Sequence, residues 1–94
     1  MDDLRIANVR FVAAPREEVK RGLLGWVSLV LNDAVQLDGL TLRRTLEGRL
    51  TLSFPARRDA AGCQHAFVRP LDNASRCEIE AQVFRALGYQ GVIR

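Results

Sequence analysis

The sequence is poor in the side chains that perform chemistry. Its 94 residues contain two cysteines and one histidine, and Cys63 and Cys77 lack the spacing of zinc ligands. His65 has no second histidine to pair with, and its position beside Phe67 in a strand-like pattern favours a structural role. No glycine-rich loop precedes Lys-Ser or Lys-Thr, the arrangement that cradles nucleotide phosphates. We therefore expect no enzyme, no cofactor, no metal site and no small-molecule substrate.

Long apolar segments are also missing. The longest, residues 23–31, is interrupted by Gly25 and Ser28 and is too short to cross a bilayer. Residues 1–3 include two aspartates and lack the positive flank of a signal peptide. These features predict a single domain over residues 1–94 that is cytoplasmic, has no membrane partner and keeps its cysteines as thiols.

Charge is modest in total but uneven along the chain. The formal net charge is +3. Residues 1–40 carry five basic and six acidic side chains, whereas residues 41–94 carry nine basic and five acidic ones. All of the net positive charge therefore lies in the second half, which indicates an anionic partner.

Alternation of apolar and polar residues predicts an antiparallel sheet. Residues 23–31 place apolar side chains on both faces of the expected strand, which is typical of a central strand covered on both sides. A helix is expected to cover one side and a partner subunit the other. Trp26 lies in this strand, where packing is favoured over stacking on bases. The five expected strands cover residues 6–12, 23–31, 35–45, 49–54 and 64–69.

Turn residues divide these strands. Asn32-Asp33 and Glu47-Gly48 predict tight turns, and the charged residues 14–18 predict a simple connection. Between these two turns, the alternation of apolar and polar residues shifts by one position at Asp38-Gly39. This shift predicts a β-bulge with a positive φ at the glycine.

A helix is expected after the last strand. Ser75 and Glu78 fit a capping box, an apolar stripe follows, and Gly88 is placed to end the helix. The stripe consists of Ile79, Val83, Ala86 and Leu87. The predicted fold is thus α+β, a five-stranded antiparallel β-meander with one C-terminal helix packed on it. Its remaining edge and apolar surface favour a homodimer formed by pairing of the two sheets.

Arginines form the one candidate binding feature. Three groups stand near predicted strand ends or the helix start, where they could converge on phosphate groups. A solvated basic face without a ligand explains the same residues equally well. The groups are Arg43 with Arg44, Arg57 with Arg58, and Arg69 with Arg76.

An ordered series of short motifs resembles the stage V sporulation protein G (SpoVG) family of septation proteins. The clearest segment is Leu-Ser-Phe-Pro-Ala-Arg-Arg at residues 52–58, an apolar residue, proline, a small residue and two basic residues at a strand end. Arg-Pro-Leu at residues 69–71 stands where the family usually has His-Pro-Ile, and residues 72–76 resemble the family's entry into its helix. Residues 6–11 and 27–33 resemble its first two strands.

The resemblance implies a homodimeric sheet-and-helix protein that binds DNA or RNA and acts in gene regulation, septation and sporulation-type cell-cycle control. Carried over to this chain, the implied contacts are Arg57, Arg58 and Arg76. Glu78 stands where the family often has a lysine, and Glu80 adds a second acid, so both oppose phosphate binding. A non-catalytic protein-interaction module in cell division, without nucleic-acid binding, is the alternative reading.

Overall fold

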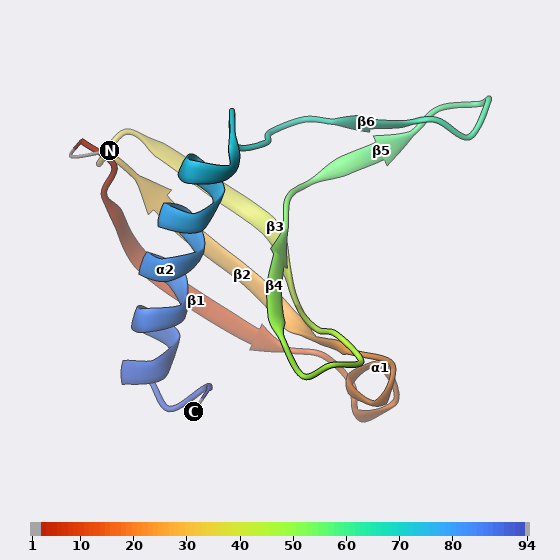
Figure 1. Cartoon of the computed structure of the whole chain (residues 1–94), viewed down its shortest axis with the longest axis horizontal. Coiled ribbons are helices and arrows are strands. Elements are labelled where there is room, and N and C mark those ends of the chain that lie inside the picture. Colours follow the sequence, from red (N-terminus) through yellow and green to blue (C-terminus); the bar gives the residue numbers. More distant parts are fainter. Residues whose placement is uncertain (1–2, 94) are drawn as a thin grey trace.

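The computed structural model describes residues 3–93 and shows an α+β fold (Figure 1). A four-stranded antiparallel sheet has the order β1-β2-β3-β4, and two further strands form a separate two-stranded sheet. The elements in chain order are β1 (Ile6–Ala13), α1 (Arg16–Lys20), β2 (Leu23–Leu31), β3 (Val35–Arg44), β4 (Leu50–Ser53), β5 (Ala56–Arg58), β6 (Gln64–Ala66) and α2 (Asn73–Tyr89). Within the described residues, no helix combines the length and apolar character needed to cross a bilayer.

The first four expected strands form the meander, but the fifth prediction is wrong. The segment 64–69 yields only the three residues of β6, which pair with β5 instead of extending the main sheet. Pro55 has no amide hydrogen with which to continue the ladder after β4, so the chain turns away there. The two short strands then project from the body as a ribbon in which every residue is exposed (Figure 1).

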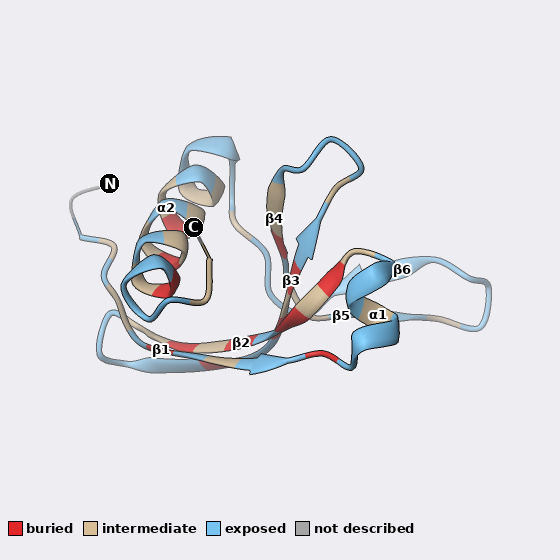
Figure 2. Ribbon diagram, turned by 90° about the horizontal axis from the view of Figure 1, so that it is seen from below, coloured by how far each residue is buried: buried red, intermediate tan, exposed pale blue. Residues whose placement is uncertain are grey.

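The core lies between the sheet and one face of α2 (Figure 2). The central strand β2 contributes Val27 and Leu29, and the apolar stripe of α2 contributes Ile79, Val83 and Leu87, as its spacing predicts. The opposite face of the sheet has no covering element among the described residues. Trp26 on that outer face is 37% exposed, so its indole is not part of the core.

The bulge in β3 is confirmed. Val27 pairs with Leu40 and Leu29 pairs with Leu37, so two residues of β3, Asp38 and Gly39, stand opposite a single residue of β2. Gly39 has a φ of 77°, a conformation that strains side chains with a Cβ. Because of this extra residue, Leu37 before the bulge and Leu40 after it both face the core and are buried.

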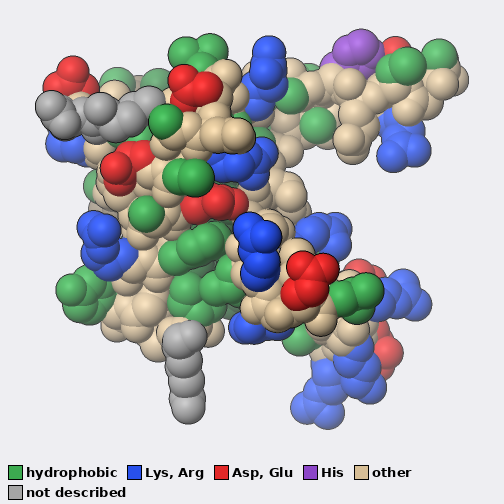
Figure 3. Space-filling view, viewed as in Figure 1, with side chains coloured by type: hydrophobic (Ala, Val, Ile, Leu, Met, Phe, Trp, Pro, Cys, Tyr) green, Lys and Arg blue, Asp and Glu red, His purple; other side chains and the backbone are tan. Residues whose placement is uncertain are grey.

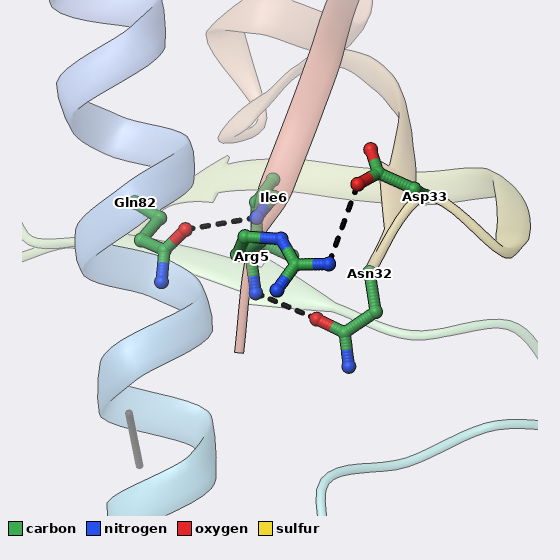
Figure 4. A network of polar contacts seen from close by, with 5 residues as sticks. All are labelled: Arg5, Ile6, Asn32, Asp33 and Gln82. Carbon is green, nitrogen blue, oxygen red and sulfur yellow. Dashed lines mark hydrogen bonds and ion pairs between the residues drawn. The ribbon is translucent and has the colours of Figure 1, made fainter. Parts of the chain in front are cut away.

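The turn between β2 and β3 is also confirmed. Asn32 and Asp33 both have positive φ values, 50° and 56°, and the Ala34 N–H closes the turn by donating to the Leu31 carbonyl at 3.0 Å. The Asn32 side-chain oxygen accepts the Arg5 amide hydrogen at 2.7 Å, and the Arg5 guanidinium lies 3.3 Å from the Asp33 carboxylate (Figure 4). The turn therefore also holds the chain segment that leads into β1.

Two local expectations are corrected. Residues 14–18 do not form a simple connection, because a short helix, α1, begins at Arg16 with acids in its first turn and Lys20 in its last, as the helix dipole favours. The cap of α2 is not Ser75 but Asp72, whose carboxylate accepts the Ser75 amide hydrogen at 2.8 Å. The helix also runs past Gly88 to Tyr89 before it ends.

Polar side chains of α2 and of its C-cap residue, Gln90, bind the outer edge of both edge strands. On β1, the Gln82 amide accepts from the Ile6 N–H at 2.9 Å (Figure 4) and Gln90 donates to the Val9 carbonyl at 2.8 Å. On β4, Glu80 accepts from the Leu52 N–H at 3.1 Å. The helix thus covers the core and also satisfies backbone groups that an edge strand would otherwise expose.

Candidate nucleic-acid interface

The six arginines selected from the sequence differ in the exposure and the ion pairing of their guanidinium groups. Arg76 is the partly buried one; the other five, Arg43, Arg44, Arg57, Arg58 and Arg69, are exposed. Within residues 3–93, none of these five makes an ion pair with a carboxylate. Five guanidinium groups are therefore available to an anionic ligand.

Arg76 is engaged within the protein. Its guanidinium donates to the Leu52 carbonyl at 3.1 Å, lies 3.7 Å from the Glu80 carboxylate and stands over the Phe54 ring at 5.9 Å from the centroid. Together with Glu80, it fastens α2 to the edge of β4. The expectation that Arg76 waits at the helix start for a phosphate is therefore not supported by its contacts.

The start of α2 is likewise occupied. The Asp72 carboxylate accepts the hydrogen bond that an incoming anion would need, and the backbone N–H and hydroxyl of Ser75 lower the pKa of Asp72. A fixed negative charge there opposes phosphate binding by the helix dipole. The sequence reading missed this because it gave the capping position to Ser75.

Arg43 borders a groove on the outer face of the sheet, which we call the outer groove. The groove has a volume of about 480 Å³ and lies between β3, the end of β4 and the base of the projecting ribbon. Thr41 and Arg43 follow each other at alternate positions of β3, and Ser53 is the cross-strand partner of Thr41. Hydroxyl groups and one cation thus line the sheet side of the outer groove.

The ribbon supplies the other wall and separates its two arginines. Gln64 lines the outer groove and pairs with Arg58, whereas Arg57 pairs with His65. Because cross-strand partners share a face, Arg58 lies on the groove side of the ribbon and Arg57 on the back. Arg43 therefore lines the outer groove, and Arg58 stands next to it, on the same face of the ribbon as the lining residue Gln64.

The remaining arginines do not join this site. Arg44 follows Arg43 but projects to the opposite face of β3, where it lines a different groove beside α1. Arg69 lies in the segment between β6 and α2. These placements do not bring all three pairs together beside the helix start, and Figure 3 shows basic side chains in several separate places on one face.

The ribbon tip is organised by Asp59. One oxygen of its carboxylate accepts the amide hydrogens of Ala61 and Cys63, both at 2.9 Å, and the other lies 2.7 Å from the His65 ring nitrogen. His65 is the main cause that lowers the pKa of Asp59, followed by the Cys63 amide. The single histidine thus has a structural role at the tip, next to the strand that carries both ribbon arginines.

Acid is expected to loosen this tip. The lowered pKa of Asp59 means that its contribution is complete above the unfolded-state value and is lost as pH falls through the lower, folded-state value. Asp59→Ala removes at neutral pH the carboxylate that acid would protonate. Amide exchange at Ala61 and Cys63, measured by NMR, should therefore be faster in this variant. An Asp38→Ala variant in the β3 bulge serves as the control, and unchanged exchange in Asp59→Ala would contradict the assignment.

The sequence reading missed three groove residues, Thr41, Ser53 and Gln64. Nothing in their local pattern marks them, because they acquire a shared location only when the ribbon folds back beside the sheet. Within residues 3–93, no three His, Cys, Asp or Glu side chains form a metal-binding cluster. A scan against protein-family models and a search of curated proteins each returned no match.

Proposed function

We propose that this chain is a non-catalytic, nucleic-acid-binding regulatory protein that holds phosphate groups of DNA or RNA between Arg43 and Arg58. The observation that carries the proposal is the outer groove, which Arg43 lines and beside which Arg58 shares a ribbon face with Gln64. Both guanidinium groups are exposed and make no ion pair within residues 3–93. Arginine suits this role because its planar fork donates two hydrogen bonds to one phosphate. Arg57 and Arg69 add positive charge along the ribbon and its return segment.

The resemblance to the SpoVG family supports the same proposal through its motifs alone. The implied sheet with a C-terminal helix agrees with the observed α+β architecture. The proline and double-arginine motif at residues 52–58 occupies the end of β4 and all of β5, and residues 53–56 of it line the outer groove. We therefore propose a cytoplasmic role in septation or sporulation-type cell-cycle control.

Sequence preference is expected to be weak. The apolar stripe of α2 is buried, and its polar side chains at positions 76, 80 and 82 bind the sheet edges. The exposed face of α2 carries Cys77, Ala81, Arg85 and Gly88, and only Arg85 among them has a long polar side chain that could reach a base edge in a major groove. Phosphate contacts position a protein without selecting a sequence, so binding should be similar across unrelated fragments.

Salt dependence tests the proposal. Affinity for duplex DNA and for single-stranded RNA, measured by fluorescence anisotropy, should fall steeply as salt rises, because bound phosphates release counterions. Two arginines per chain in a dimer predict a slope of log K against log salt of about −2 to −4. An affinity that does not change with salt concentration, or no binding at micromolar protein, would refute the proposed function.

A homodimer formed by pairing of the two sheets is part of the proposal. Helix-side residues occupy the edge groups of Ile6 and Val9 on β1 and of Leu52 on β4, and the uncovered outer face offers a broader surface for pairing. Val12 and Trp26 are cross-strand partners there, at 64% and 37% exposure. Light scattering should give twice the chain mass, and Trp26→Glu should reduce it to one chain if this face pairs.

The same exposed apolar pair supports a second candidate, a protein-interaction module in cell division that does not bind nucleic acid. Charge reversal at Arg57 and Arg58 separates the two. If the cellular phenotype survives this change but is lost in Trp26→Glu, the interaction function is correct and the nucleic-acid function is not.

A further inference from the structure

A second groove lies at the opposite end of the β3–β4 hairpin from the ribbon. It has a volume of about 540 Å³, and we call it the α1 groove. Its lining combines three cations with three apolar side chains. They are Lys20, Arg21, Arg44, Val19, Leu24 and Leu46.

Backbone hydrogen bonds fix the two walls relative to each other. The Gly22 N–H donates to the Val19 carbonyl at 3.0 Å, which closes the end of α1. The Gly22 carbonyl in turn accepts from the Arg44 N–H at 2.8 Å, which joins that end to the last residue of β3. The groove is therefore built into the fold before any ligand arrives, which reduces the entropy cost of binding.

The charge of the α1 groove is uncompensated. No carboxylate is among its lining residues, and within residues 3–93 none of the ion pairs involves Lys20, Arg21 or Arg44. Glu18 and Glu47 are neighbours in sequence but do not line it. An occupant should therefore carry negative charge.

The apolar residues narrow the choice of occupant. Leu46 is fully exposed and Val19 is 40% exposed, although both stand beside the cations of the groove. Phosphodiester backbones bind through cations and hydrogen-bond donors and gain little from leucine and valine. A peptide with alternating acidic and apolar side chains would use both halves, burying the leucine while its carboxylates meet the cations.

We propose that the α1 groove binds an acidic peptide segment of a partner protein that carries apolar side chains between its carboxylates. The site is separate from the outer groove, because Arg43 and Arg44 project to opposite faces of β3. One chain could then hold nucleic acid at one groove and a protein partner at the other. This inference does not depend on the nucleic-acid function.

The test uses a fluorescein-labelled peptide of alternating glutamate and leucine, titrated with the full chain and followed by anisotropy. Binding is expected, and a peptide with glutamine in place of glutamate should bind at least about tenfold more weakly, as the loss of charged hydrogen bonds predicts. Lys20→Glu with Arg44→Glu should weaken binding of the glutamate peptide by at least about tenfold. Leu46→Ser, at a fully exposed position that leaves the fold intact, should weaken it about fivefold.

The matched control is Arg57→Glu with Arg58→Glu, which changes the net charge equally on the ribbon. The proposal requires that this control retain peptide binding. Equal losses in both double variants, or no effect of Leu46→Ser, would show simple charge attraction and overturn it. Displacement of the peptide by a short DNA duplex that needs Lys20 and Arg44 would assign the groove to nucleic acid and also overturn it.

Discussion

Leu29→Ala is expected to lower the free energy of unfolding by about 2–5 kcal/mol, the usual cost of such a truncation in a core. Leu29 is fully buried in the central strand and belongs to the cluster that packs against α2. The neighbouring strands are held by hydrogen bonds on both sides of β2, so the cavity cannot close by a simple shift. The free energy of unfolding of such domains is only about 5–15 kcal/mol, so this substitution should remove a large part of the stability.

Urea unfolding followed by circular dichroism measures this loss. Leu46→Ala is the matched control, because it removes the same atoms from a fully exposed side chain and should change stability by less than about 0.5 kcal/mol. Similar midpoints for the two variants would mean that β2 is not the centre of the core.

Charge reversal at Arg43 and Arg58 should nearly abolish nucleic-acid binding. Each charged hydrogen bond to phosphate contributes about 1.5–3 kcal/mol, so losing Arg43 and Arg58 together should weaken affinity by at least about 100-fold. Reversal also adds repulsion at both positions. The salt slope of the Arg43→Glu, Arg58→Glu variant should approach zero at the same time.

Two comparisons make this result specific. Arg16→Glu with Arg21→Glu changes the net charge equally at the other end of the hairpin and should cost far less affinity. Arg57→Glu should weaken binding less than Arg58→Glu, although the two residues are adjacent, because they lie on opposite faces of the ribbon. An equal effect of all these changes would show that overall charge, and not the groove, binds the ligand.

Local patterns predicted the main sheet well, because its register depends on which alternate residues of each strand are apolar and face the core. The shift between Leu37 and Leu40 indicated the bulge, and the Asn32-Asp33 pair indicated the turn; both are confirmed. The α2 stripe was found for the same reason, since its period is a property of nearby residues. The fifth strand failed because alternation identifies extended backbone but not its pairing partner.

The site was less predictable than the fold. Exposure of five of the six arginines follows from their charge, but which arginines share a groove depends on where the chain turns after Pro55. The contacts of Arg76 could not be predicted, because its partners, Leu52 and Glu80, lie on a strand and a helix turn that the sequence does not show as adjacent. Asp72 and Ser75 both suit a helix cap, so residue type alone did not decide between them.

The hydrogen bonds from α2 to both edge strands have a consequence for self-association. Gln82 and Gln90 occupy backbone groups of Ile6 and Val9 at one edge, and Arg76 with Glu80 occupies those of Leu52 at the other, so the helix partly blocks two boundaries at which further strands could add. A chain that lost this helix would open both boundaries together and uncover the leucine-rich surface between them. Such a sheet could recruit copies of itself in both directions, so the same helix that completes the core also limits fibril growth.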